Sequence, residues 1–167
     1  DPSVIRKPQF ARIEKVIPKS EWNVLQKEAK KKGITTSTLL CTAYALVLGY
    51  WSNQPELTIN VTVFTRYPFN EGVTDIVGGF TSVILLRVNL LGRSDFWKLA
   101  SEIQNQLMDA LEHRHYDGMN VIRKIAEQAE MKEQAVMPVV FTSLLFSMEE
   151  GDIVTIEDLG EVKMGVS

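Results

Sequence analysis

Two adjacent hydroxyl residues, Thr142 and Ser143, lie in an apolar run whose composition predicts a strand over residues 137–146. Successive side chains of a strand point to opposite faces, so Thr142 should share a face with Val140 and Ser143 with Phe141. Neutral hydroxyls can polarise a carbonyl and move protons without a metal. Taken alone, the pattern also fits a threonine favoured by strand propensity and a serine bonded to backbone.

The two histidines carry little chemical signal. His113 and His115 are two residues apart in a predicted helix end, so they point to different faces and do not suit a shared metal. His115 also lacks the spacing of the His-His, three residues, Asp-Gly motif of chloramphenicol-acetyltransferase-type enzymes. Asp117 is better explained as a helix cap. The sequence contains no phosphate loop, dinucleotide fingerprint, metal-ligand cluster or nucleophile elbow.

Composition narrows the class of protein. The chain has 167 residues, 45% of them hydrophobic, with a net charge of −3 and a pI near 5.5. This balance argues against a nucleic-acid surface, which needs a basic face. The dense basic run, residues 30–32, is expected at a helix end, where cations offset the dipole. The sequence has a single cysteine, Cys41, no apolar run long enough to cross a membrane and no signal-peptide pattern. We therefore expect a cytoplasmic protein.

The pattern of elements begins with a linker at residues 1–9, followed by one domain over residues 10–167. Residues 10–17 alternate loosely and predict an edge strand. A first helix is expected between an N-cap at Ser20 and a stop at Gly33. A second, capped by Thr35 or Thr36 and reaching Trp51, is apolar on nearly all sides and should be buried.

Strands are predicted at residues 57–65, 80–90 and 137–146, and residues 67–79 should form a Gly-containing loop. Ser94 is the expected cap of a helix reaching Leu111, and Asp117 of another reaching Ala129. The tail suggests a short strand pair around Gly151 and Gly160. The order of elements predicts an α/β fold with helices packed on a mixed sheet, without an internal domain boundary.

Three segments carry a family resemblance. They are residues 36–52 (TSTLLCTAYALVLGYWS), 77–82 (VGGFTS) and 138–145 (PVVFTSLL), in that order along the chain. Together they resemble the heterocyclization subclass of non-ribosomal peptide synthetase condensation domains, and the likeness extends over almost the whole chain. The resemblance implies the C-terminal lobe of a two-lobed, chloramphenicol-acetyltransferase-like fold with the active site in a tunnel between the lobes.

The resemblance also implies an activity and partners. Carrier-protein domains would deliver two thioester substrates on phosphopantetheine arms, and no cofactor would be bound directly. Peptide bond formation with a carrier-bound Cys, Ser or Thr would precede cyclodehydration to a thiazoline or oxazoline. The family's first lobe, and a later segment whose aspartate the family pairs with its threonine, are not in this chain. We therefore expect the chain alone to be inactive and to require adjacent synthetase domains.

Family roles can be transferred to six positions. The resemblance implies catalytic roles for Thr142 and Ser143, and substrate-binding roles at four further positions, which are Thr65, Gly79, Phe80 and Thr81. Two of these depart from the family pattern, since Thr65 stands where the family usually has Asn and Gly79 where it usually has Asp. The chain thus lacks an amide and a carboxylate that could hold substrate or orient the loop.

Several alternatives stay open at this point. The parent domain could condense without cyclizing, or be a degenerate partner of a second cyclization domain. It could also be a docking module for carrier proteins that performs no chemistry, which the departures favour and the intact segment 138–145 opposes. A free-standing acyltransferase of the same fold would carry its own His-His-Asp-Gly motif upstream. Because a lobe without its partner exposes apolar surface, we also predict self-association.

Overall fold

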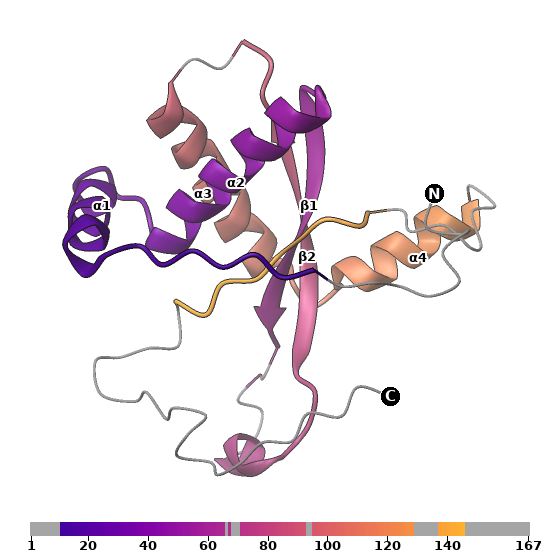
Figure 1. The fold of residues 1–167 in the computed structure, drawn as a ribbon. Coiled ribbons are helices and arrows are strands. Elements are labelled where there is room, and N and C mark those ends of the chain that lie inside the picture. Colours follow the sequence, from indigo (N-terminus) through magenta and orange to yellow (C-terminus); the bar gives the residue numbers. More distant parts are fainter. Residues whose placement is uncertain (1–10, 66, 68–70, 93–94, 129–136, 146–167) are drawn as a thin grey trace.

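A computed structural model describes residues 11–65, 67, 71–92, 95–128 and 137–145 (Figure 1). Two helices precede the first strand, and two more separate the second strand from the third. The elements are α1 (Lys19–Lys31), α2 (Thr36–Ser52), β1 (Glu56–Phe64), a 3-10 helix (Glu71–Asp75), β2 (Thr81–Asn89), α3 (Phe96–Glu112), α4 (Gly118–Gln128) and β3 (Val140–Phe141).

The strands form a mixed sheet, as the sequence predicted, and their order in it is β2-β1-β3. β1 and β2 are antiparallel and pair along their whole length, from Glu56 opposite Asn89 to Phe64 opposite Thr81. β3 runs parallel to β1 and is much shorter than the predicted strand 137–146, because only Val140 and Phe141 join the ladder. The predicted tail strands around Gly151 and Gly160 lie outside the described residues.

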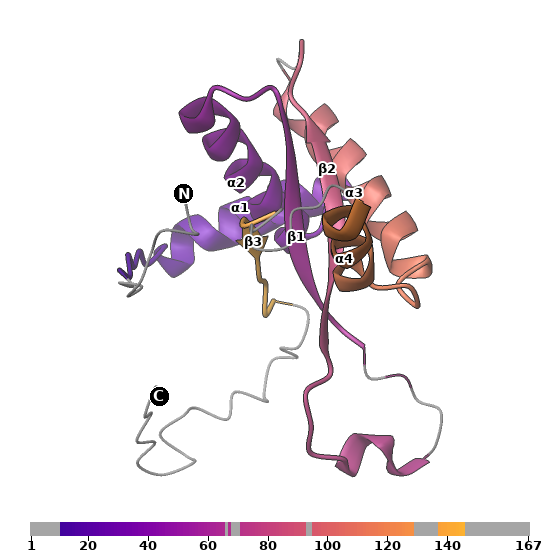
Figure 2. The same cartoon turned by 90° about the vertical axis from the view of Figure 1, so that its right-hand side faces the viewer.

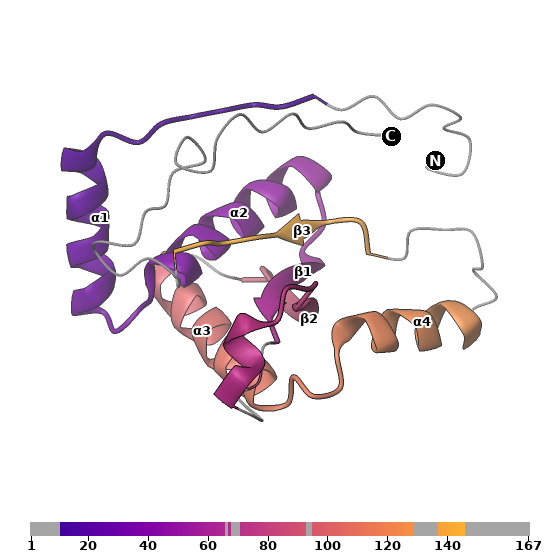
Figure 3. The ribbon, with the colours of Figure 1, turned by 90° about the horizontal axis from the view of Figure 1, so that it is seen from below.

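Helices cover the two faces of the sheet unequally (Figures 1 and 3). Alternate residues of β1 and β2, including Ile59, Val61 and Leu86, pack with α2 and α3 in the main core. On the other face α4 packs against β2, and its first residue, Gly118, lies so close that a Cβ atom would approach the Val83 carbonyl oxygen to 2.8 Å. The period of two in these strands therefore separates a core face from a more open face.

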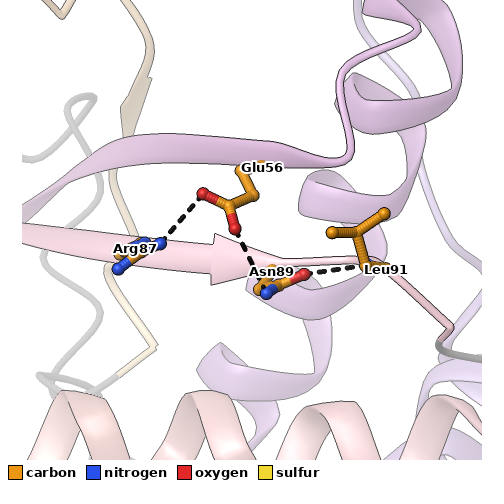
Figure 4. A network of polar contacts seen from close by, with 4 residues as sticks. All are labelled: Glu56, Arg87, Asn89 and Leu91. Atoms are coloured by element: carbon orange, nitrogen blue, oxygen red, sulfur yellow. Dashed lines mark hydrogen bonds and ion pairs between the residues drawn. The ribbon is translucent and has the colours of Figure 1, made fainter.

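The polar end of the sheet lies on this more open face (Figure 4). The Glu56 carboxylate accepts hydrogen bonds from Arg87 at 2.9 Å and Asn89 at 3.3 Å, and the Asn89 side-chain oxygen accepts the Leu91 N–H at 2.9 Å. Exposed ion pairs of this kind contribute little free energy. The network instead secures the cross-strand register where β1 begins and β2 ends.

The turn between α1 and α2 is fixed by capping. Gly33 adopts φ +68, as expected for a residue that ends a helix, and the Thr35 side chain accepts the Thr38 N–H at the start of α2. From α3, Gln104 accepts the Thr35 N–H at 2.8 Å and donates to the Gly33 carbonyl oxygen at 2.6 Å. The Gln104 side chain thus connects the turn between α1 and α2 to α3. Lys30 and Lys31 occupy the last turn of α1, as predicted.

Three expectations about the element ends were wrong. Residues 11–17 are exposed and form no strand, because they pair with none of the described strands and alternation alone cannot supply a partner. α1 begins at Lys19, with Pro18 rather than Ser20 at the N-cap and the Pro18 carbonyl accepting the Trp22 N–H at 2.9 Å. The cap of α3 is Asp95 rather than Ser94, since its carboxylate accepts two backbone N–H groups.

Helix α2 is less buried than its composition predicted. Its N-terminal half is enclosed by the core, but Val47, Tyr50 and Trp51 are 54%, 82% and 79% exposed. The buried side of the helix is lined instead by small residues such as Thr42 and Ala45, which allow close approach to the sheet. The apolar aromatic face is therefore directed outward.

Within the described part of the chain, no single helix is long and apolar enough to cross a membrane. Only α1 and α2 taken together have the length and apolar composition of a membrane span, and the two helices are bent by 100° at the break between them.

Candidate functional site

A pair of threonine hydroxyls lies where β3 ends. The parallel register places Asn60 beside Val140 and Val61 beside Phe141. The next residues along the two strands, Thr62 and Thr142, bring their Oγ1 atoms to 2.8 Å. This contact is exposed, and it lies on the sheet face opposite the α2 and α3 core.

Ser143 faces the other way. Its Oγ lies 2.7 Å from the Oγ of Ser37, a buried residue in the first turn of α2. The preceding residue, Phe141, packs its ring against Tyr44 of the same helix at 5.9 Å between centroids. The alternation predicted for Thr142 and Ser143 is therefore confirmed, and the two hydroxyls serve opposite faces.

A cavity of about 280 Å³ lies beside these hydroxyls, between the start of α2, strands β1 and β3 and the end of α3. Apolar side chains make most of its lining, with hydroxyls from both sides and Arg114 as a charged member. The lining comprises Thr35, Ser37, Thr38, Val61, Thr62, Val63, Phe64, Ile84, Leu107, Met108, Leu111, Arg114, Phe141 and Ser143. Thr62 thus belongs both to the threonine pair and to the cavity, whereas Thr142 does not line it.

Residues in the turn between α3 and α4 contact Tyr67, which follows the end of β1. The ring of Tyr67 stacks on His115 at 4.8 Å between centroids, and the Arg114 guanidinium lies 5.2 Å from the centre of the same ring. The 3-10 helix follows Tyr67 and stands off the end of the sheet, away from the helices (Figures 1 and 2). Arg114 therefore connects the cavity with the base of this projecting segment.

The four predicted substrate-binding positions cluster at the end of the β1–β2 hairpin. The Thr65 N–H and hydroxyl both donate to the Phe80 carbonyl oxygen, at 2.7 and 3.0 Å. Thr81 pairs with Phe64, and Gly79 is exposed with open space where a Cβ atom would lie. The Thr65 hydroxyl is thus used to close the hairpin, and position 79 has room for a larger side chain.

Burial and local hydrogen bonds shift the pKa of a few described side chains. Burial raises the pKa of the Cys41 thiol to about 12, so this α2 cysteine stays protonated and packs as an apolar group. A hydrogen bond to the Asp109 carbonyl raises the pKa of the exposed His113, with a further contribution from the Asp109 charge. No group of three His, Cys, Asp or Glu side chains suited to a metal occurs among the described residues.

Sequence reasoning identified Thr142 and Ser143 but missed Thr62 and Ser37, which contact them. The alternating pattern of residues 57–65 placed Thr62 on one face of a strand, but its partner depends on which strand lies alongside. Ser37 carries no signal of its own within the helical segment 36–52. The missing information was the parallel register of β1 and β3.

Comparison with protein families adds the decisive observation. The model of the family described as "Condensation domain" matches residues 5–167. The chain belongs to the condensation domain family. Its architecture, a mixed sheet flanked by helices, is the fold of solved condensation domains, as the sequence predicted.

Individual relatives span different synthetases. This condensation domain chain is 45% identical to bacitracin synthase 1 of Bacillus licheniformis over 87% of its length, which is 3% of that protein. It is 36% identical to phenyloxazoline synthase MbtB of Mycobacterium tuberculosis over 70% of its length, or 8% of that protein. The chain therefore spans a small part of the curated relatives that it matches.

Among solved structures, the EpoB NRPS cyclization-docking bidomain from Sorangium cellulosum is similar, with 34% identity and a TM-score of 0.75. The match covers 87% of this chain and 29% of the EpoB chain. The condensation domain described here thus resembles one portion of a larger, two-domain chain.

Proposed function

We propose that residues 10–167 are the C-terminal subdomain of a heterocyclization-type condensation domain in a non-ribosomal peptide synthetase. The complete domain would join a carrier-bound acyl or aminoacyl donor to a carrier-bound Cys, Ser or Thr and cyclodehydrate the product to a thiazoline or oxazoline. The likeness to a cyclization bidomain and to a phenyloxazoline synthase supports this subclass.

The observation that carries the proposal is the Thr62–Thr142 hydroxyl pair. Each hydroxyl has one proton and can also accept, so one member can accept from its neighbour while donating to a bound carbonyl oxygen. Such a donor would stabilise negative charge that develops on that oxygen. The pair is exposed on the open sheet face, where a second lobe and a substrate could reach it.

The proposed reaction has two stages. The acceptor amine attacks the donor thioester carbonyl, a C–N bond forms, the C–S bond breaks and the pantetheine thiol leaves with a proton. The acceptor's side-chain sulfur or oxygen then attacks the new amide carbonyl, and loss of that oxygen as water leaves a C=N bond in the ring. Thr142 would donate to the carbonyl oxygen in both stages, with Thr62 as the residue that orients its hydroxyl.

The remaining predicted residues take positioning roles in this proposal. Thr65, Phe80 and Thr81 would shape the hairpin end near the substrate, and Gly79 would leave it open. Ser143, bonded to Ser37, would hold the end of β3 against α2 so that Thr142 faces outward. The partners would be carrier proteins with phosphopantetheine arms, the other lobe and adjacent synthetase domains, in a reducing cytoplasm where a cysteine acceptor stays free.

A second candidate, condensation without cyclization or docking without chemistry, is favoured by two positions. The Thr65 hydroxyl is engaged by the Phe80 carbonyl, and Gly79 offers no functional group. If these positions limit cyclization, the double change Thr65→Asn and Gly79→Asp in the complete domain should raise the fraction of cyclized product. Unchanged product chemistry would show that these two positions do not limit cyclization.

The deciding experiment is intact mass spectrometry of the complete domain with a carrier-bound donor and carrier-bound cysteine. A product lighter by one water than the simple amide supports heterocyclization. An uncyclized amide supports condensation only, and the absence of product with correctly loaded carriers supports the docking module.

A further inference from the structure

The cavity beside the hydroxyl pairs differs in character from the open sheet face. Its walls are largely apolar, with Ile84 from β2, Leu107 and Leu111 from α3 and Phe141 from β3. Its polar members are the hydroxyls of Thr35, Ser37, Thr38, Thr62 and Ser143 and the side chain of Arg114, and the Ser37 and Ser143 hydroxyls are bonded to each other. A concave apolar site with a few placed polar groups is typical of small-molecule recognition.

Its volume indicates how much of a ligand it could hold. Pockets for whole drug-sized ligands begin at about 300 Å³, and a cavity of about 150 Å³ already accommodates benzene. The cavity here, at about 280 Å³, therefore suits one ring or a branched alkyl group rather than an entire thioester.

The cavity is also within reach of the proposed reaction centre. β3 ends at Phe141 while β1 continues to Phe64, so the edge of β1 that faces β3 has no ladder partner among the described strands from Thr62 onward. Thr62 lines the cavity and its hydroxyl contacts Thr142. A carbonyl held by the threonine pair would thus have its substituent close to the cavity.

We infer that this cavity is the specificity pocket for the donor acyl group, and that it takes a single aromatic ring or a branched alkyl side chain. The inference rests on the proposed function. The acceptors in that reaction are Cys, Ser or Thr, whose small polar side chains must remain free to attack, so an apolar cavity of this size suits the donor instead.

Met108 offers a direct test, because it lines the cavity from α3 and is 45% exposed. A larger side chain at this position should therefore narrow the cavity without disturbing the packing of the core. In the complete domain with its carriers, Met108→Trp should lower kcat/KM for phenylacetyl and leucyl donors by about tenfold or more. The alanyl donor should be affected by less than about twofold. Met108→Ala should shift selectivity toward the larger donors. Gln106→Trp, an exposed change on the same helix outside the lining, is the matched control.

A uniform loss of rate for all donors, or no change for any, would overturn the inference. If the unmodified domain forms no product, a binding measurement still decides: the methyl-carbon NMR signal of Met108 is followed while the phenylacetyl thioester of N-acetylcysteamine is added. A saturable shift of the Met108 signal, with competition by the leucyl thioester, supports the pocket. In the Met108→Trp variant the Leu111 methyl signals are followed instead, and their shift should be weaker. An unshifted signal overturns it independently of catalysis.

Discussion

At the scale of the residue, the Thr142 hydroxyl is the group whose removal is most informative. Thr142→Val keeps the shape of the side chain but removes the donor next to Thr62. If the hydroxyl stabilises developing charge, product formation by the complete domain should fall about 100-fold or more. Because the contact is exposed, the free energy of unfolding should change by less than about 1 kcal/mol. Single-turnover assays and urea unfolding measure the two effects.

Thr142→Ser is the matched control, since it restores the hydroxyl and should recover most of the activity. A valine variant with unimpaired turnover would exclude a catalytic role for this hydroxyl. A valine variant that loses activity and stability together would instead indicate that the threonine pair holds β3 in place.

Cys41 gives a prediction on pH. Burial raises the pKa of its thiol from 9.0 to about 12, so the folded state holds this proton more tightly than the unfolded state. The resulting stabilisation is complete below pH 9 and is lost as the pH rises toward about 12. At pH 8 a disulfide reagent should therefore label Cys41 slowly in the folded chain and rapidly in urea. Equal rates in the two states would contradict the buried position.

The position of a single residue was predictable where the pattern of its own strand was sufficient, and not where the pairing of distant segments was required. Alternation within one strand was enough to place Thr142 and Ser143 on opposite faces, and this was confirmed. Their partners required the register between distant segments, which alternation does not contain. Whether Thr142 catalyses a reaction stays a prediction, because its position alone does not reveal a substrate.

At the scale of the element, the contact of α4 with β2 depends on a glycine. A Cβ atom at Gly118 would meet the Val83 carbonyl oxygen at 2.8 Å and the Val83 and Leu85 side chains at 3.2 Å. Gly118→Ala should therefore push the helix from the sheet and cost about 1–3 kcal/mol in the free energy of unfolding. Gly72→Ala in the 3-10 helix, where nothing lies within 4 Å, is the control and should be nearly neutral. Urea unfolding with equal losses for both variants would contradict this account.

The long elements were predictable, and their ends were less so. The helices α2, α3 and α4 and the strands β1 and β2 follow from periodicity, and Thr35 and Asp117 cap as expected. β3 was overestimated because an apolar, β-branched run reads as a strand whether or not a neighbour pairs with its whole length. The burial of α2 was overestimated because composition does not reveal which side of an apolar helix meets the sheet.

At the scale of the molecule, the outward face of α2 suggests how the isolated chain should behave. Val47, Tyr50 and Trp51 are exposed together, and Tyr50 and Trp51 pack edge to face at 6.1 Å. Exposed apolar patches commonly mark interaction surfaces. The 167-residue chain should therefore self-associate, with a weight-average mass above 18.9 kDa that rises with concentration in sedimentation experiments.

Tyr50→Lys with Trp51→Lys should reduce this association, whereas charge added at the already polar α1 position Gln26 should leave it unchanged. A chain that stays at its monomer mass over a wide concentration range would show that the exposed face of α2 does not drive self-association.

The central position of β1 has a consequence for the order in which the molecule is built. Its pairing with β2 closes a local hairpin, whereas its pairing with β3 brings together Thr62 and Thr142, which are 80 residues apart. Closing a longer loop costs more chain entropy, and contacts distant in sequence form slowly. During synthesis, the hairpin can therefore form while β3 is still inside the ribosome. The threonine pair is assembled late, after most of the core on the opposite face of the sheet.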